Sequence, residues 1–334
     1  MSILELADNA ATANFGSLPA SRWYANGIDP DDFTGPYAVQ RLKRDLFIPE
    51  LGTPGFALRR TDSVYAIGSC FARGIENTLV ANGFDVKSVA DEFDHFELSG
   101  PQVTGRGFMN KYTTHSIRAE IEWALDPSTP FPADGLIDNG DGTWADPAAN
   151  PTLKWVDHAT TIERRETISS VVRRLTDCRL VVITLGLVEV WRDTHTGMYL
   201  NITPTPAMMR AHPGRYRFEV SGFTENRANV EAIWELLART GCEDQQIVVT
   251  VSPVPLMATF SDRDIVVANT YSKSLLRTVA EDWSHAHDNV HYFPSYEIVT
   301  NSNRGLAWMP DGRHVRGELV GHIMQTFLRH YLDG

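Results

Sequence analysis

The segment Gly68-Ser69-Cys70 places two nucleophilic side chains after a glycine that permits a sharp turn. An apolar run precedes it and helical spacing follows it, so we expect it to join a strand to a helix N-terminus. There the helix macrodipole and unpaired amides would lower the pKa of the Cys70 thiol and hold a developing oxyanion. A small buried cysteine after a tight turn has the same local sequence, and this segment alone does not separate the two interpretations.

A carboxylate and an imidazole stand three residues apart near the C-terminus, in Asp311-Gly312-Arg313-His314. Asp311 can accept a hydrogen bond from Nδ1 of His314, which leaves Nε2 as a base. Taken alone, this tetrapeptide is more often a helix N-cap with a surface histidine. Metal ligation is a third possibility, but no cluster of suitable spacing accompanies the pair, so we expect no metal and no cofactor.

Strand-like and helix-like segments alternate five times, which is typical of a parallel sheet with helices on both faces. The run 179–185 is almost continuously apolar and suits a central strand. Ligands bind beyond the carboxyl ends of such strands, where residues 68–70, 186–191 and 252–254 would meet. The predicted strands are 63–67, 84–89, 179–185, 246–251 and 290–293, and the predicted helices are 71–80, 116–125, 160–176, 225–240, 264–283 and 316–331.

The remaining segments define the domain organisation. We expect residues 1–60 to form an N-terminal arm that packs on a catalytic domain of residues 61–334. Insertions are expected near 90–112, 126–160 and 190–224; the second is rich in Pro, Gly and Asp, as functional loops or lids often are, and the third begins like a hairpin. The arm offers four aromatic anchors, Trp23, Tyr24, Phe33 and Tyr37.

The composition is that of a globular protein that can bury a full core, with 43% hydrophobic and 22% charged residues among 334. Lys and Arg number 30 against 42 Asp and Glu, a net charge of −12, which disfavours binding to nucleic acid or anionic membranes. Three cysteines argue against a disulfide framework, and neither a signal peptide nor a membrane helix is apparent. We therefore expect a cytoplasmic protein, while its oligomeric state stays open.

Other polar residues receive simpler interpretations. Asn269, Ser272 and Lys273 lie near the start of the predicted helix 264–283, where we expect capping and solvation. Cys178 and Cys242 are expected to be buried and unreactive.

Residues 66–72, Ala-Ile-Gly-Ser-Cys-Phe-Ala, contain the pentapeptide that names the GSCFA family, and the chain resembles this family over about residues 60–330. The family looks like a branch of the SGNH/GDSL hydrolase clan, whose C-terminal Asp-x-x-His is matched by Asp311 and His314. The resemblance implies a flavodoxin-like three-layer αβα sandwich with a five-stranded parallel sheet, and hydrolase or acyl-transfer chemistry. Further segments that fit the family are 110–114, 183–186, 251–254 and 292–297.

The clan's Gly-Asp-Ser block places the nucleophile third, which corresponds to Cys70 and leaves Ser69 as the alternative nucleophile. The clan's Gly-x-Asn-Asp block falls on residues 186–189, where Val188 replaces the asparagine that donates to the oxyanion. That function must pass to backbone amides or to another side chain. The candidate oxyanion and substrate-binding residues are Gly68, Asn110, Gly186, Glu189 and Trp191.

These observations predict an acyl hydrolase or acyltransferase that forms a thioester on Cys70. His314 would accept the thiol proton and later activate the acceptor, while Asp311 orients His314. A thioester reacts with amines as well as with water, and carbohydrate or small-molecule acyl groups are substrates by analogy with the clan. The alternative is a non-catalytic ligand-binding protein that retains the SGNH-like pocket, which the missing oxyanion asparagine favours.

Overall fold

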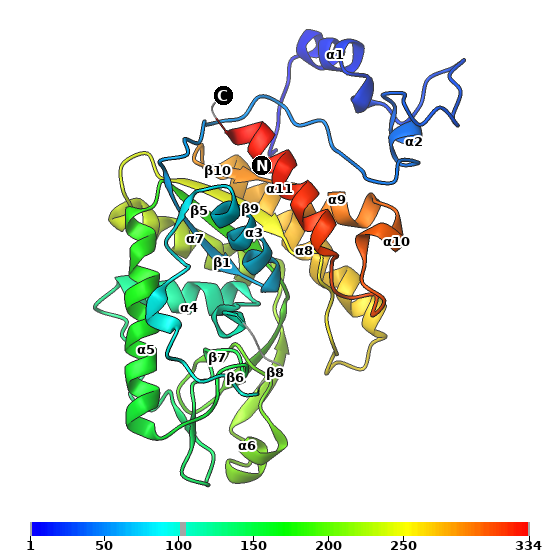
Figure 1. The fold of residues 1–334 in the computed structure, drawn as a ribbon. Coiled ribbons are helices and arrows are strands. Elements are labelled where there is room, and N and C mark those ends of the chain that lie inside the picture. Colours follow the sequence, from blue (N-terminus) through cyan, green and yellow to red (C-terminus); the bar gives the residue numbers. More distant parts are fainter. Residues whose placement is uncertain (1, 101–104, 333–334) are drawn as a thin grey trace.

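A five-stranded parallel sheet forms the centre of the protein (Figure 1). The computed structural model describes residues 2–100 and 105–332. The sheet order is β10-β9-β5-β1-β2, which confirms the predicted number and direction of the strands. The strands are β1 (Ser63–Gly68), β2 (Asp85–Val86), β5 (Leu180–Leu185), β9 (Gln246–Val251) and β10 (Val290–Tyr292).

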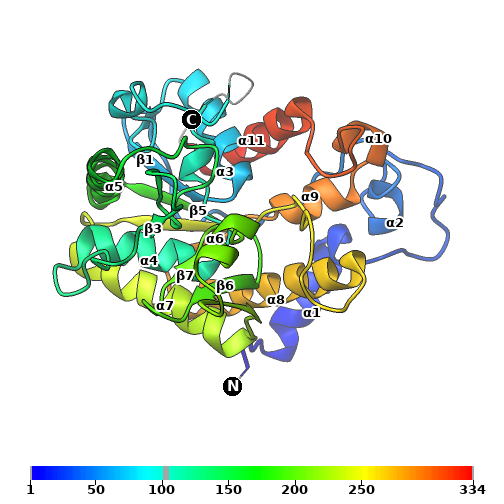
Figure 2. The same cartoon turned by 90° about the horizontal axis from the view of Figure 1, so that it is seen from below.

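Apolar side chains on both faces of the sheet hold the helices in place. Tyr65 and Ile67 of β1 pack into one apolar cluster with four helices. Val64 and Ala66 face the opposite cluster with three helices and the short α10 (Arg304–Ala307), as the two-residue period of a strand requires. Figure 2 shows α3 and α11 on one side of the sheet and α4 and α7 on the other. No helix in the two described ranges is long and apolar enough to span a membrane. The first face carries α4 (Thr114–Leu125), α5 (His158–Arg173), α7 (Phe223–Thr240) and α8 (Ile265–Ala286), and the second carries α3 (Cys70–Ala81), α9 (Ser295–Asn301) and α11 (Gly317–Tyr331).

The direction of winding reverses between β1 and β5. From β1 the chain moves outward to β2, then returns to the other side of β1 for β5 and continues to β9 and β10. Such a reversal leaves a crevice at the carboxyl ends of the two central strands, where doubly wound proteins bind ligands. The strand β2 is shorter than the predicted 84–89, because only Asp85 and Val86 pair with β1.

The predicted insertions contain secondary structure of their own. A two-stranded antiparallel sheet of β3 and β4 lies within 126–160, and a three-stranded antiparallel sheet of β7, β6 and β8 lies within 189–220. In Figure 1 this second sheet and α6 lie at the end of the molecule opposite α1. The elements are β3 (Ile137–Asp138), β4 (Trp144–Ala145), β6 (Glu189–Asp193), β7 (Tyr199–Leu200), β8 (Tyr216–Val220), α6 (Pro206–Ala211) and the 3₁₀ turns η2 (Asp91–Phe93), η3 (Gly107–Met109) and η4 (Arg174–Asp177).

The N-terminal arm contacts the main domain through its last third. The backbone amide of Phe47 donates to Oγ of Ser302 at 3.0 Å, and that of Leu58 donates to the Tyr331 carbonyl at 2.7 Å. Three of the four predicted anchors are wrong, because Trp23, Tyr24 and Phe33 are all more than 60% exposed, while Tyr37 is half-buried. The first two thirds of the arm form hydrogen bonds mainly within the arm. The elements of the arm are α1 (Asp8–Ser17), η1 (Pro19–Ser21) and α2 (Ala38–Arg41).

Candidate active site

The turn after β1 requires a glycine and uses Ser69 as a structural residue. Gly68 has φ of +136°, and a Cβ there would lie 2.3 Å from the Thr184 carbonyl oxygen. The Ser69 amide donates to Oγ1 of Thr184 at 2.8 Å, and Oγ of Ser69 accepts from the Phe71 amide at 3.3 Å as the N-cap of α3. Ser69 is only 2% exposed, whereas Cys70, the first residue of α3, is partly exposed. The two candidate nucleophiles therefore differ in accessibility, in favour of Cys70.

A cavity of about 520 Å³ opens at this edge of the sheet and is lined by both Ser69 and Cys70. This volume is within the usual range for a small-molecule site. Three of the predicted substrate-binding residues, Gly186, Glu189 and Trp191, line it as well. The rest of the lining is largely apolar and includes residues from both insertions: Asn150, Pro151, Leu187, Leu200, Ile202, Val254, Leu256, Met257 and Phe260.

The pKa of the Cys70 thiol is raised, contrary to the prediction. Burial is the main cause, and the nearby positive charges of Arg313 and Lys273 oppose it without outweighing it. The prediction considered the macrodipole of α3 but not the desolvation of a thiolate in a narrow site. Burial raises the pKa of Cys178 to about 12, and this residue is buried as predicted. Cys242 is only half-buried, so the prediction that it is buried is wrong.

Asp311 and His314 form the predicted pair. Nδ1 of His314 lies 2.6 Å from Oδ2 of Asp311, and this hydrogen bond, together with the backbone amides of Arg313 and His314, holds the pKa of Asp311 well below its ordinary value. The imidazole is about half exposed, and Nη1 of Arg313 donates to its Nε2 at 3.1 Å. Within the described residues no hydrogen bond joins His314 to Cys70 or Ser69, and Arg313 is the residue of this loop that lines the cavity.

The residues proposed around the oxyanion differ in position. Gly186 borders the cavity, and a Cβ there would approach the Tyr112 carbonyl to 2.6 Å, so this position requires a residue without a side chain. Val188 is buried and its amide donates to Oγ of Ser272 at 3.2 Å, so it has no donor to offer a ligand. Asn110 is buried outside the cavity lining, where its Nδ2 lies 3.4 Å from the Tyr112 hydroxyl. The Tyr112 side chain, which does line the cavity, separates Asn110 from the role predicted for it.

Three buried polar atoms of residues that line the cavity have no hydrogen-bond partner among the described residues. They are Nε1 of Trp191, Oγ of Ser252 and Nε of Arg313, and the Ser252 side chain is fully buried. Leaving a buried polar atom without a hydrogen-bond partner costs about 1–3 kcal/mol. A ligand that supplies the missing partner would recover this cost, so these atoms are candidate ligand contacts. By contrast, Glu189 already accepts a hydrogen bond from Thr259 at 2.6 Å.

The sequence interpretation missed Lys273, which is fully buried rather than solvated. Its Nζ donates to the carbonyl oxygens of Gly186 and Val254, each at 2.7 Å, and both of these residues line the cavity. The signal was present, because Lys273 precedes Leu276 by three residues and Ala280 by seven, which places it on the buried face of α8.

A buried network of four charges supports the turn from the α4 side. Nζ of Lys111 lies 2.6 Å from Oε2 of Glu120, and the Lys111 amide donates to the Gly68 carbonyl at 2.7 Å. Arg165 binds Glu120 and also Asp146, the latter at 3.2 Å. Two positive and two negative charges thus compensate one another where each is at least 90% buried.

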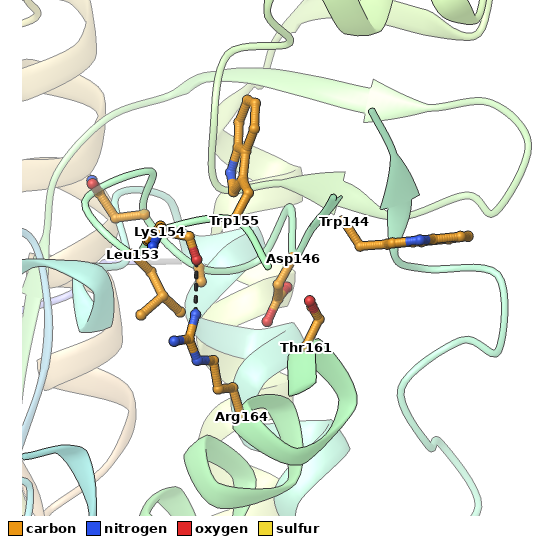
Figure 3. A pocket seen from close by; sticks show the side chains of 9 residues that line it. Trp144, Asp146, Leu153, Lys154, Trp155, Thr161 and Arg164 are labelled. Carbon is orange, nitrogen blue, oxygen red and sulfur yellow. Dashed lines mark hydrogen bonds between the residues drawn. The ribbon is translucent and has the colours of Figure 1, made fainter. Parts of the chain in front are cut away.

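A second recess, shown in Figure 3, lies beside the insertion 126–160. Its volume is only about 20 Å³, enough for about one water molecule, and Nη1 of Arg164 closes one side by donating to the Lys154 carbonyl at 2.8 Å. No cysteine or serine is among the described residues that line it. Nowhere in residues 2–100 or 105–332 do three or more His, Cys, Asp or Glu side chains gather as metal ligands would.

The fold and the site define the class: this is a doubly wound α/β protein with a cysteine at the helix N-terminus beside the switch point and an Asp-His loop before the last helix. The chain belongs to the GSCFA family, whose profile matches residues 63–327, from the first residue of β1 into α11. The match confirms the resemblance and includes Cys70, Lys273 and His314. No curated protein is similar enough to the chain to count as a relative.

Proposed function

We propose that the protein is an acyl hydrolase or acyltransferase that uses Cys70 as a covalent nucleophile. The observation that carries this proposal is the placement of the Cys70 thiol at the N-terminus of α3, in a cavity of about 520 Å³ at the switch point of the sheet. Ser69 lines the same cavity, but its hydroxyl caps α3 and contacts Thr184. The thiol is therefore the more available of the two.

The reaction has two steps. Sγ of Cys70 attacks the acyl carbonyl, a carbon–sulfur bond forms, and the bond to the leaving group breaks as His314 transfers the thiol proton to that group. Water or an acceptor alcohol or amine then attacks the thioester, loses its proton to His314, and the thiolate leaves. The Cys70 amide is a suitable donor to the oxyanion, since helix N-termini carry N–H groups without helical partners, whereas the Phe71 amide already donates to Ser69.

His314 must exchange one hydrogen bond to take part. Asp311 already fixes Nδ1, so the lone pair of Nε2 is the basic site, and that site now accepts from Arg313. Catalytic hydrogen bonds often form only in the substrate complex. A substrate carboxylate or phosphate that binds Arg313 would release Nε2 toward the thiol.

The cavity walls favour an apolar acyl group. Trp191 packs edge-on against Phe260 with 5.2 Å between the ring centroids, and Leu200, Ile202 and Leu256 complete an apolar surface. Burying such a group is favourable by about 25 cal/mol per Å² of apolar area. Acyl groups larger than acetyl should therefore bind better than acetyl.

The test is intact-protein mass spectrometry after incubation with activated esters and thioesters of increasing acyl length. We expect an acyl adduct on wild type, its loss in Cys70→Ala and its retention in Ser69→Ala, with the modified peptide containing Cys70. An adduct that survives in Cys70→Ala and vanishes in Ser69→Ala would assign the chemistry to Ser69.

The second candidate function is ligand binding without catalysis. The raised pKa of Cys70 and the occupied Nε2 of His314 favour it, because both make the thiol a poorer nucleophile in the structure as it stands. Binding of acyl ligands without an adduct under any donor would support this function over catalysis.

A further inference from the structure

Lys273 has no evident structural reason to be a lysine. It is fully buried in α8, and no carboxylate of the described residues lies within salt-bridge distance of it. Its two hydrogen bonds go to neutral carbonyl oxygens of Gly186 and Val254. A buried ammonium without a counter-charge is costly, and such a group is usually retained for a function.

The two carbonyls that Lys273 binds belong to Gly186 and Val254, which line the same cavity as Cys70, so the ammonium group lies directly behind the wall of the cavity that holds the thiol. Burial lowers the pKa of Lys273 to about 7, a thiolate at Cys70 raises it and Arg313 lowers it. In return, Lys273 and Arg313 lower the pKa of Cys70 against the effect of burial. The other titratable groups around the cavity are Tyr112 and Glu189, together with the exposed pair of Asp311 and His314 beside Arg313.

We propose that Lys273 and Cys70 form one buried ionisable pair, in which the ammonium group of Lys273 stabilises the Cys70 thiolate from behind the cavity wall. This inference rests on the proposed role of Cys70 as the nucleophile. Lys273 does not line the cavity, so it acts through Cys70 and does not touch the substrate. A thiolate at Cys70 favours the charged form of the buried Lys273, and Lys273 compensates part of the desolvation of that thiolate.

A coupled pair releases its two protons in two steps. After the first step one proton remains, and in a fraction of molecules the thiolate faces the ammonium group. After the second step the thiolate faces a neutral amine. The rate of Cys70 alkylation by iodoacetamide, in which Sγ displaces iodide, should therefore rise twice with pH in the wild type, first near pH 7.

The decisive variant is Lys273→Met, which removes the charge and retains an apolar stem of similar length. We expect a single rise at higher pH and an alkylation rate at pH 8 at least about tenfold below wild type, which corresponds to a shift of about one pH unit. Lys273→Arg keeps a positive charge that does not titrate, so it should show a single rise at lower pH than Lys273→Met.

Ser272→Ala is the matched control. Ser272 is the neighbouring residue of α8, is equally buried, and accepts a hydrogen bond from the Val188 amide at 3.2 Å. Its loss disturbs the same loop without changing charge, so both rises should remain. A profile in Lys273→Met that matches wild type or Ser272→Ala would overturn the pair, as would a wild-type Cys70 that does not react below pH 10.

A reciprocal measurement does not depend on a folded Lys273→Met variant. The chain has only five lysines, so ¹³C NMR can follow each Cε, with Lys273→Arg giving the assignment. Coupling is reciprocal, and Cys70→Ala should therefore move the Lys273 titration to lower pH. An unchanged midpoint contradicts the pair.

Neither measurement uses an acyl donor, so the two proposals fail separately. A shifted alkylation profile without any acyl adduct retains the pair and removes the proposed function. An adduct on Cys70 with an unshifted profile does the opposite.

Discussion

The substitution Glu120→Gln tests whether the buried charge network supports the site. Glu120 is fully buried and accepts from both Lys111 and Arg165. Glutamine keeps the shape but removes the negative charge, which leaves two buried positive charges with only Asp146 as a counter-charge. Breaking a buried ion pair in this way costs about 3–5 kcal/mol.

For a chain of 334 residues, at about 2.1 cal/mol/K of unfolding entropy per residue, that loss lowers the melting temperature by roughly 4–7 °C. Urea denaturation followed by tryptophan fluorescence, together with calorimetry at pH 7, gives both quantities. Glu122→Gln is the matched control, since Glu122 lies two residues away on α4 and pairs with Arg118 at 2.7 Å near the surface. We expect it to cost about 0.5 kcal/mol or less.

Equal losses in the two variants, or a loss below about 1 kcal/mol in Glu120→Gln, would refute the reasoning that burial determines the value of these charges. The double variant Lys111→Met with Glu120→Gln adds a further check. It removes one charge of each sign, so it should be less destabilised than the sum of the two single variants.

Two more substitutions test individual contacts. Thr184→Val removes the Oγ1 group that accepts from the Ser69 amide and should cost about 1–3 kcal/mol in urea unfolding, while Thr184→Ser retains most of the stability. Asp193 is buried and accepts two hydrogen bonds from Arg215, one from the His195 amide and one from the Thr196 hydroxyl. Burial raises the pKa of Asp193, but these four bonds and the charge of Arg215 outweigh burial and lower it. Its carboxylate therefore contributes stability above about pH 4 that is lost as the pH falls further. Asp193→Asn should cost about 1.5–3 kcal/mol at pH 7, with a smaller difference from wild type at pH 3, and the exposed Asp134→Asn should change little at either pH.

The fold was predictable because its signals are local. The run 179–185 forms the central strand β5, and the segment with helical spacing after Cys70 forms α3. Both were predictable because the pattern of apolar residues along the sequence differs between a buried strand and an amphipathic helix. The pairing of Asp311 with His314 was predictable for the same reason, because three residues separate them.

The electrostatics of the site were not predictable, because they depend on burial by distant segments. Cys70 is partly buried in a site whose walls include residues as distant in sequence as Phe260. No local sequence rule gives the resulting rise in the pKa of the thiol. The same limitation led to the wrong expectations for Lys273 and for the exposed anchors Trp23 and Phe33. Composition and periodicity identify which side chains are apolar but not which charged ones the fold encloses.

The two buried lysines near the site, Lys111 and Lys273, differ in how their charges are compensated. Lys111 is neutralised by Glu120 and holds the Gly68 carbonyl, so its charge is compensated within the framework. Lys273, on α8, has no such carboxylate among the described residues, so a thiolate at Cys70 is the charge that can compensate it. A scaffold that neutralises one buried lysine with a carboxylate and leaves the other without one disfavours the charged form of the second, and a thiolate at Cys70 offsets part of that cost. In return, the ammonium group of Lys273 lowers the pKa of the Cys70 thiol against the effect of burial, which is how a cysteine with a raised pKa can still act as a nucleophile.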